Sequence, residues 1–128
     1  MKRLNLAFTD LLYIQVRTNQ FSVRNISTQQ EQVFFATNAF TTQRLLIGDF
    51  DAAEQTLTLA LKALSRRYVL WRPVAVIHPL ELIEGGLSPV EQIVLRDVVL
   101  NARARKSLVW VGHLLSDDEV RTMIEAAL

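Results

Sequence analysis

Cysteine is absent from the 128 residues of this sequence. Its absence excludes a disulfide framework, a thiolate metal site and a cysteine nucleophile, and it fits a reducing cytoplasm. No apolar run approaches the roughly 18 residues that a membrane-spanning helix needs. The opening residues, MKRLNLAF, are too short and too interrupted by charge for a secretory signal. The sequence therefore predicts a cytoplasmic chain.

An excess of one charge is lacking too, because 14 Lys and Arg residues oppose 13 Asp and Glu residues for a net charge of +1. This balance gives no support for a nucleic-acid partner. Hydrophobic residues make up 50% of the chain and charged residues 21%, which is the composition of a globular protein. The length suits one domain with its own core. We therefore expect a single domain over residues 1–128.

Three short strands are predicted near the start of the chain. Residues 11–16, 21–26 and 32–36 are rich in aliphatic and aromatic side chains, and short polar links separate them. The first link reads RTNQ and resembles a tight turn. Strands joined by such short links favour an antiparallel meander.

A helix is expected over about residues 51–66, with Asp49 or Asp51 as its cap. Five apolar side chains fall there at steps of three or four, which places them on one helix face. These are Phe50, Ala53, Leu57, Leu61 and Leu64.

Two capping boxes mark later helices. SPVE at 88–91 predicts a helix that reaches about residue 104, and SDDE at 116–119 predicts a final helix. The apolar face of the final helix consists of Val120, Met123, Ile124 and Ala127. Apolar runs at 73–78 and 107–113 precede these helices and have the pattern of buried strands. The resulting order, βββαβαβα, predicts an α/β protein with helices packed on a mixed sheet.

Three stretches resemble MreB, the rod-shape-determining family of bacterial actin homologues. FTDLLYIQVRTNQFSVRNI is similar to the first hairpin of that family, and IGDFDAAEQTLTLALKAL to its Gly-x-Ile-x-Asp-Phe segment and following helix. RPVAVIHPLELIEGGLSPVEQIVLRDVVLNARARKSLVWVG resembles its strand, Val-Pro turn and V-E-x-x-x-I-R-E helix. The residues in step with this last motif are Val90, Glu91, Arg96, Asp97, Ala102, Ala104 and Arg105. The resemblance covers nearly the whole chain but only the first half of an actin-like protein, and it implies a ribonuclease H-like fold.

The same resemblance implies that a nucleotide site has been lost. In the family, a hairpin aspartate positions a magnesium-bound water, and a glycine lets backbone N–H groups approach the phosphates. Gln15 and Arg17 stand in those places here, and only Thr18 is retained. Gln15 lacks the carboxylate charge, and the Arg17 side chain fills space where a phosphate would approach the backbone. We therefore expect a vestigial hairpin, no cofactor and no ATP hydrolysis.

The competing hypothesis is an enzyme, either a metal-dependent ribonuclease H-like nuclease or a nucleotide-binding phosphotransferase. A nuclease of this kind needs clustered carboxylates that hold two metal ions, one of them on the first strand. Gln15 occupies that place, and Asp10, Glu54 and Glu81 are the nearest other candidates. Scattered acids of this number are more often solvated surface residues.

His78 and His113 each follow a predicted parallel strand, where ligands gather in open α/β sheets. They could share a metal or carry out acid–base chemistry. No Asp or Glu stands beside them at metal-ligand spacing, so a structural or exposed role is favoured. Gly85 and Gly86 lack the pattern of a phosphate loop and are expected to be loop residues.

Two basic stretches, at 66–73 and 101–106, follow predicted helices. A cation at a helix C-terminus is favoured by the helix dipole, which is the simpler interpretation. A shared surface for a nucleic acid or an acidic partner is the alternative. Residues 1–8 place apolar side chains at helical spacing beside Lys2 and Arg3, so contact with the inner membrane surface is an open expectation.

The function expected from these observations is protein interaction without catalysis. The chain would act as an actin-like scaffold domain, in bacterial cell-shape or envelope-assembly machinery, as the resemblance implies. A sheet without a second subdomain leaves strand edges and one face uncovered, and such surfaces favour self-association or a protein partner.

Overall fold

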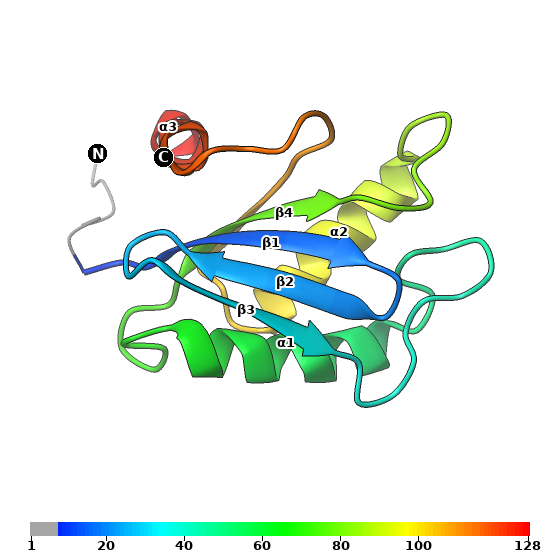
Figure 1. Ribbon diagram of the computed structural model, residues 1–128, viewed down its shortest axis with the longest axis horizontal. Coiled ribbons are helices and arrows are strands. Elements are labelled where there is room, and N and C mark those ends of the chain that lie inside the picture. Colours follow the sequence, from blue (N-terminus) through cyan, green and yellow to red (C-terminus); the bar gives the residue numbers. More distant parts are fainter. Residues whose placement is uncertain (1–7) are drawn as a thin grey trace.

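The protein is described here over residues 8–128 by a computed structural model, which contains the predicted order of five strands and three helices (Figure 1). The strands are β1 (Leu11–Arg17), β2 (Gln20–Asn25), β3 (Gln30–Phe35), β4 (Val74–Pro79) and β5 (Lys106–Val109). The helices are α1 (Phe50–Leu64), α2 (Pro89–Asn101) and α3 (Asp117–Ala127).

The strands form one mixed sheet in the order β3-β2-β1-β4-β5. β1 pairs antiparallel with β2, and β2 antiparallel with β3, which confirms the predicted meander. β4 lies parallel to β1 on its other side, and β5 lies parallel to β4. This α/β topology is compatible with the ribonuclease H-like fold. It leaves β3 and β5 as the two edges of the sheet.

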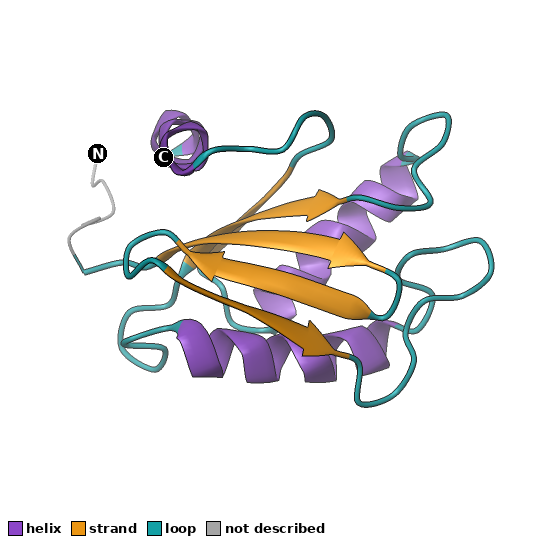
Figure 2. Ribbon diagram, in the orientation of Figure 1, coloured by secondary structure: helices purple, strands orange, loops and turns teal. Residues whose placement is uncertain are grey.

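Helices cover the two faces of the sheet unequally. α1 and α2 pack together on one face, over a core that includes Leu12, Ile14 and Val16 (Figure 2). α3 packs on the opposite face against Leu11 and Tyr13. Side chains along a strand alternate between faces, so β1 supplies both cores. Because α3 packs mainly on β1 and β4, the second face of β2 and β3 is left without a helix.

Local capping begins each helix at its observed position. Asp49, rather than Asp51, is the cap of α1, because its side chain accepts a hydrogen bond of 3.1 Å from the Ala52 N–H. Ser88 and Ser116 each form both bonds of a capping box, which confirms the two predicted starts. Within residues 8–128, no helix has the length and apolar character needed to cross a membrane.

Several predicted boundaries were wrong at the ends of the elements. α1 stops at Leu64 instead of residue 66, where the Arg66 N–H donates to the Asp10 side chain. α2 stops at Asn101 instead of 104, because Arg103 has a left-handed backbone with φ of 79°.

The strand predicted at 107–113 is short and ends at Val109, since the chain then turns away from the sheet. The indole of Trp110 donates to the His113 carbonyl across this turn. β3 runs from Gln30 to Phe35, two residues earlier than predicted at its start, because all six residues pair with β2. In α3, Val120 and Ile124 are buried, whereas Met123 and Ala127 are only half-buried.

Candidate functional site

The hairpin that resembles a nucleotide site lies at the carboxyl end of β1. Gln15 pairs with Ser22 across the hairpin, and Arg17 pairs with Gln20 just before the turn. Gln15 and Arg17 are both half-buried. They point to the same side of the sheet as Tyr13, which is the side that α3 covers only in part.

Backbone donors of this turn are already engaged. The Thr18 N–H donates to Oε1 of Glu81 at 2.5 Å, and the Asn19 N–H donates to the Thr41 hydroxyl at 2.9 Å. A phosphate cradle needs such N–H groups free to face anionic oxygens. Here a carboxylate occupies one of them, and its negative charge would repel a phosphate at that position.

The carboxylates considered for a nuclease lie apart. Asp10 precedes β1 and is bound to Arg66, whereas Glu81 follows β4. β1 and β4 are parallel, with Leu11 opposite Val74, so these two acids lie at opposite ends of the sheet. Glu54 lies on α1, beside a groove lined with basic side chains. Residues 8–128 contain no group of three or more His, Asp or Glu side chains that could hold a metal ion.

His78 lies in β4 and is fully buried, so the favoured structural role is the one it has. Its Nε2 donates to the Gly112 carbonyl at 3.1 Å, so its Nδ1 accepts from the Tyr13 hydroxyl at 2.7 Å. That hydroxyl in turn accepts a hydrogen bond of 3.1 Å from the Leu115 N–H. Burial lowers the pKa of the His78 imidazole, which keeps the ring neutral. The network holds the segment between β5 and α3 against the sheet.

His113 is exposed and does not share a site with His78. Its Nε2 lies 2.7 Å from Oε2 of Glu119 on α3. The pKa of Glu119 is lowered, first by the Ser116 N–H of the capping box and then by His113. Each histidine therefore has a structural partner of its own. Gly85 and Gly86, with φ of 78° and 87°, are loop residues as predicted.

The two basic stretches come together in space, which the sequence left open. Lys62, Arg67 and Arg103 line one broad groove beside the end of α1. Tyr68 joins the stretches, because its buried hydroxyl donates to the Ala102 carbonyl at 2.8 Å. Burial raises the pKa of the Tyr68 hydroxyl. The predicted membrane contact through residues 1–8 lies outside the described residues except for Phe8, which stacks on Trp71.

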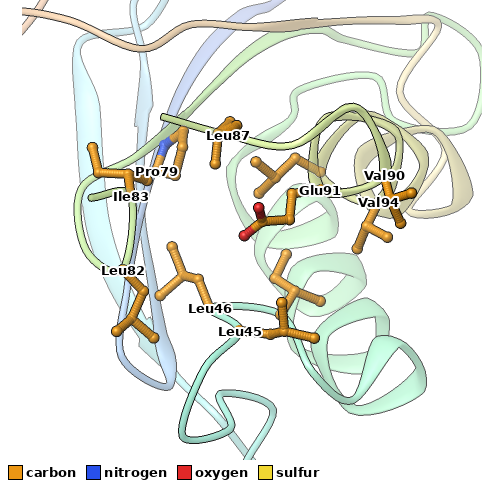
Figure 3. Close-up of a pocket in the computed structure, with 11 residues that line it drawn as sticks. Leu45, Leu46, Pro79, Leu82, Ile83, Leu87, Val90, Glu91 and Val94 are labelled. Atoms are coloured by element: carbon orange, nitrogen blue, oxygen red, sulfur yellow. The ribbon is translucent and has the colours of Figure 1, made fainter. Parts of the chain in front are cut away.

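An apolar pocket that the sequence analysis did not identify lies beside the hairpin, at the carboxyl end of β4 (Figure 3). Its cavity volume is about 60 Å³, and it opens to solvent on one side. The lining residues come from the loop before α1, the loop after β4 and the first turns of α2: Leu45, Leu46, Ile47, Pro79, Leu82, Ile83, Leu87, Val90, Glu91, Val94 and Leu95. Ligands of open α/β proteins bind at this end of the sheet.

Glu91 is the one charged residue among those that line this apolar pocket. Figure 3 shows its carboxylate directed into the space between α2 and the loop after β4. Its Oε1 accepts the Ser88 N–H at 3.0 Å within the capping box. Among the described residues, Oε2 accepts no hydrogen bond. The pocket therefore combines aliphatic walls with one carboxylate oxygen that is available to a partner.

Comparison with known proteins found no matching family model. It did find a curated relative in Escherichia coli (strain K12), the uncharacterized protein YjaA. The two sequences are 37% identical over 126 residues, which cover 90% of this chain and 97% of YjaA. A similarity of this extent, over an α/β sheet of the order β3-β2-β1-β4-β5, shows that the chain belongs to the YjaA family of bacterial proteins.

Proposed function

We propose that this chain is a non-catalytic, actin-like interaction domain that acts as a scaffold through self-association or a protein partner. The observation that carries the proposal is the exposure of β3, which leaves both an edge and one apolar face of the sheet uncovered. Val33 and Phe35 point to the face that lacks a helix, and their exposed fractions are 40% and 72%. Large apolar side chains are seldom left exposed together unless another molecule covers them.

The β3 edge also lacks the features that block strand pairing. An edge strand presents unpaired N–H and C=O groups, and lysine, proline or a bulge usually protects it. β3 contains neither lysine nor proline, and its one charged side chain, Glu31, lies 3.8 Å from Arg24 of β2. Two copies could pair their β3 strands antiparallel about a twofold axis, as in symmetric dimers.

We expect the protein to elute above its monomer mass of 14.6 kDa in size-exclusion chromatography with light scattering. Replacing Val33 and Phe35 together by lysine should return it to the monomer mass, because two cations on each edge would repel the second copy. The matched control is Leu114→Lys, which changes a side chain 61% exposed in the loop before α3. A wild-type monomer at high concentration would count against this part of the proposal.

Engagement of the turn N–H groups supports the absence of nucleotide chemistry. Millimolar ATP with magnesium should leave the melting temperature unchanged, since a ligand that does not bind the folded state cannot stabilise it. Glu81→Ala frees the Thr18 N–H and tests whether the carboxylate alone prevents binding. We expect no stabilisation of this variant either, because Gln15 and Arg17 remain. A nucleotide-dependent rise in the wild type would favour the phosphotransferase alternative instead.

A role in cell-shape or envelope-assembly machinery rests on the MreB resemblance alone. Attachment to a membrane surface belongs to the same proposal, and one contact supports it. Phe8 stacks on Trp71 at 5.4 Å, and Val69 and Leu70, which precede Trp71 in the chain, are exposed. Arg67 lies over the Phe8 ring, so this region is both apolar and basic. Chromatography of the full chain with anionic vesicles tests the contact by co-elution.

A further inference from the structure

The loop between β4 and α2 is unusually apolar for a surface loop. Residues 80–88 read LELIEGGLS, and three of their aliphatic side chains, Leu82, Ile83 and Leu87, line the apolar pocket. Surface loops and turns are normally built from Gly, Pro, Asn, Asp and Ser. Leu87 also packs against the core, whereas Leu82 is 42% exposed, so part of this apolar wall faces solvent.

Leu82 is held in a strained backbone conformation within this wall. Its φ of 55° lies in the left-handed region, which a bulky side chain rarely adopts. Its side chain is 42% exposed, so burial in this chain does not offset the strain. Strained residues that persist are concentrated at binding and switch sites. The left-handed backbone at Leu82 therefore supports, beside the exposed aliphatic lining, a binding role for the mouth of the pocket.

Several apolar side chains of the pocket remain exposed to solvent. Leu45, Leu82 and Val90 come from three different segments, line the pocket and are 43%, 42% and 68% exposed. A buried pocket for a small ligand would enclose most of that ligand. This one leaves much of its aliphatic lining exposed, which is typical of a macromolecular contact.

The charge at the pocket specifies the partner further. Glu91 directs its carboxylate into the space (Figure 3), and the apolar loop carries two further acids, Glu81 and Glu84. A carboxylate that loses water on binding needs a cation or donor to compensate. An anionic or wholly apolar partner would leave it unpaired. The matching chemistry is an aliphatic side chain next to Lys or Arg.

Elimination among the common recognition modes gives the conformation of the partner. Strand addition is excluded at β4, because both of its edges are paired, with β1 and with β5. Proline-rich peptides need aromatic-lined grooves, and the residues that line this pocket include no aromatic side chain. An acidic or phosphorylated motif would be repelled by Glu91. Among the other modes, the aliphatic lining best fits an amphipathic helix in an apolar groove.

We propose that the apolar pocket binds an amphipathic helix of a partner protein, with aliphatic anchors between the loop after β4 and α2 and a Lys or Arg paired with Glu91. This inference deepens the proposed interaction function by specifying a second contact surface and the chemistry of its partner. It does not depend on the β3 edge, because the pocket lies on different segments.

Three fluorescein-labelled helical peptides test the proposal by fluorescence anisotropy. The first has Leu at positions i and i+4 and Lys at i+3 on an Ala and Gln background. The second replaces the Lys by Glu, and the third replaces both Leu by Ala. The Leu–Lys peptide should bind measurably, and each of the others about tenfold more weakly or not at all. Absence of binding by the Leu–Lys peptide, or equal binding by all three, would overturn the proposal.

Matched variants locate the peptide. Glu91→Gln keeps the capping box, because glutamine also serves at that position. It should lower the affinity for the Leu–Lys peptide about fivefold. Leu82→Gly removes one wall of the pocket and suits the left-handed backbone at this position. It should lower the affinity for the Leu–Lys peptide about tenfold, with no loss of melting temperature. Leu114→Gly is the control outside the pocket.

Unchanged affinity in both pocket variants would place the peptide elsewhere and sink the inference. The mass of the protein in light scattering should stay the same in all three variants. Failure at the pocket is therefore distinguishable from failure of self-association through β3.

Discussion

Replacing His78 by alanine is expected to lower the free energy of unfolding by about 3 kcal/mol, the largest change among the variants considered. The side chain is fully buried in β4 and makes two hydrogen bonds. Its loss leaves a cavity and removes the acceptor of the buried Tyr13 hydroxyl. Urea unfolding followed by circular dichroism measures the change.

The same residue makes stability depend on pH. The folded-state pKa of His78 lies below the value of the unfolded chain, so the unfolded state takes up a proton first as the pH falls. The stability that the neutral ring provides is therefore present above about pH 6.5 and is lost as the pH falls toward the folded-state pKa. While His78 stays neutral in the folded state, the slope that it contributes is about 1.4 kcal/mol per pH unit. His78→Ala should remove this contribution.

Two observations would contradict this account of His78. One is a loss well below 1 kcal/mol in His78→Ala, and the other is an unchanged pH slope between pH 5 and 7. Tyr13→Phe provides a second test, because it leaves Nδ1 of His78 and the Leu115 N–H without partners. It should lower stability by about 1–2 kcal/mol. The double variant should lose less than the sum, since both residues belong to one network.

Asp117 titrates at lower pH than His78, so it does not contribute to the change in stability between pH 5 and 7. Hydrogen bonds from Arg24 and then Gln29 lower its pKa to about 2. Its contribution is therefore present above the unfolded value of 3.8 and is lost as the pH falls toward 2. The pH range from 5 to 7 reports on His78 without a change at Asp117.

Asp10→Ala is expected to lower stability by about 2–3 kcal/mol, the second largest effect. Asp10 is 2% exposed, and its carboxylate accepts from the Arg66 N–H and from Nε of Arg66, both at 2.7 Å. The alanine variant removes the acceptor of a backbone N–H and frees the connection between α1 and β4 from the start of β1. Chemical unfolding at pH 7 measures the loss.

The matched control for Asp10 is an ion pair at the surface. Asp117 accepts from Nε of Arg24 at 2.9 Å, but the two side chains are 33% and 28% exposed. Exposed pairs contribute little because water and salt screen them, so Asp117→Ala should cost no more than about 1 kcal/mol. Equal losses in the two variants would show that burial is not what makes the Asp10 contact strong.

Local signals were sufficient to predict the elements of this protein. Capping boxes at Ser88 and Ser116 placed two helix starts correctly, because each cap forms between residues only three positions apart. Alternation of strand and helix after residue 50 gave the parallel half of the sheet. The ends of the elements were predicted less well. The end of α1, for example, depends on the contact of Arg66 with Asp10, which lies 56 positions away in the chain.

Side-chain roles at the candidate site depended on the tertiary structure. His78 was predicted at the end of a strand with a structural or exposed role, and only the packing of β4 shows that it is buried against Tyr13. Glu81 was considered as a metal-binding acid, whereas it accepts the Thr18 N–H of the hairpin. Leu45, Leu82 and Val90 carry no shared sequence signal, because the pocket forms only when three loops and helix ends converge.

The sequence by itself determined the α/β class and the order of the elements. Those properties follow from hydrophobic period, capping and residue identity, which act over a few positions. Only the tertiary structure decided which edge of the sheet is open, where the apolar pocket lies and which partner each buried polar group has. These depend on contacts between residues far apart in the chain, and no local pattern encodes them.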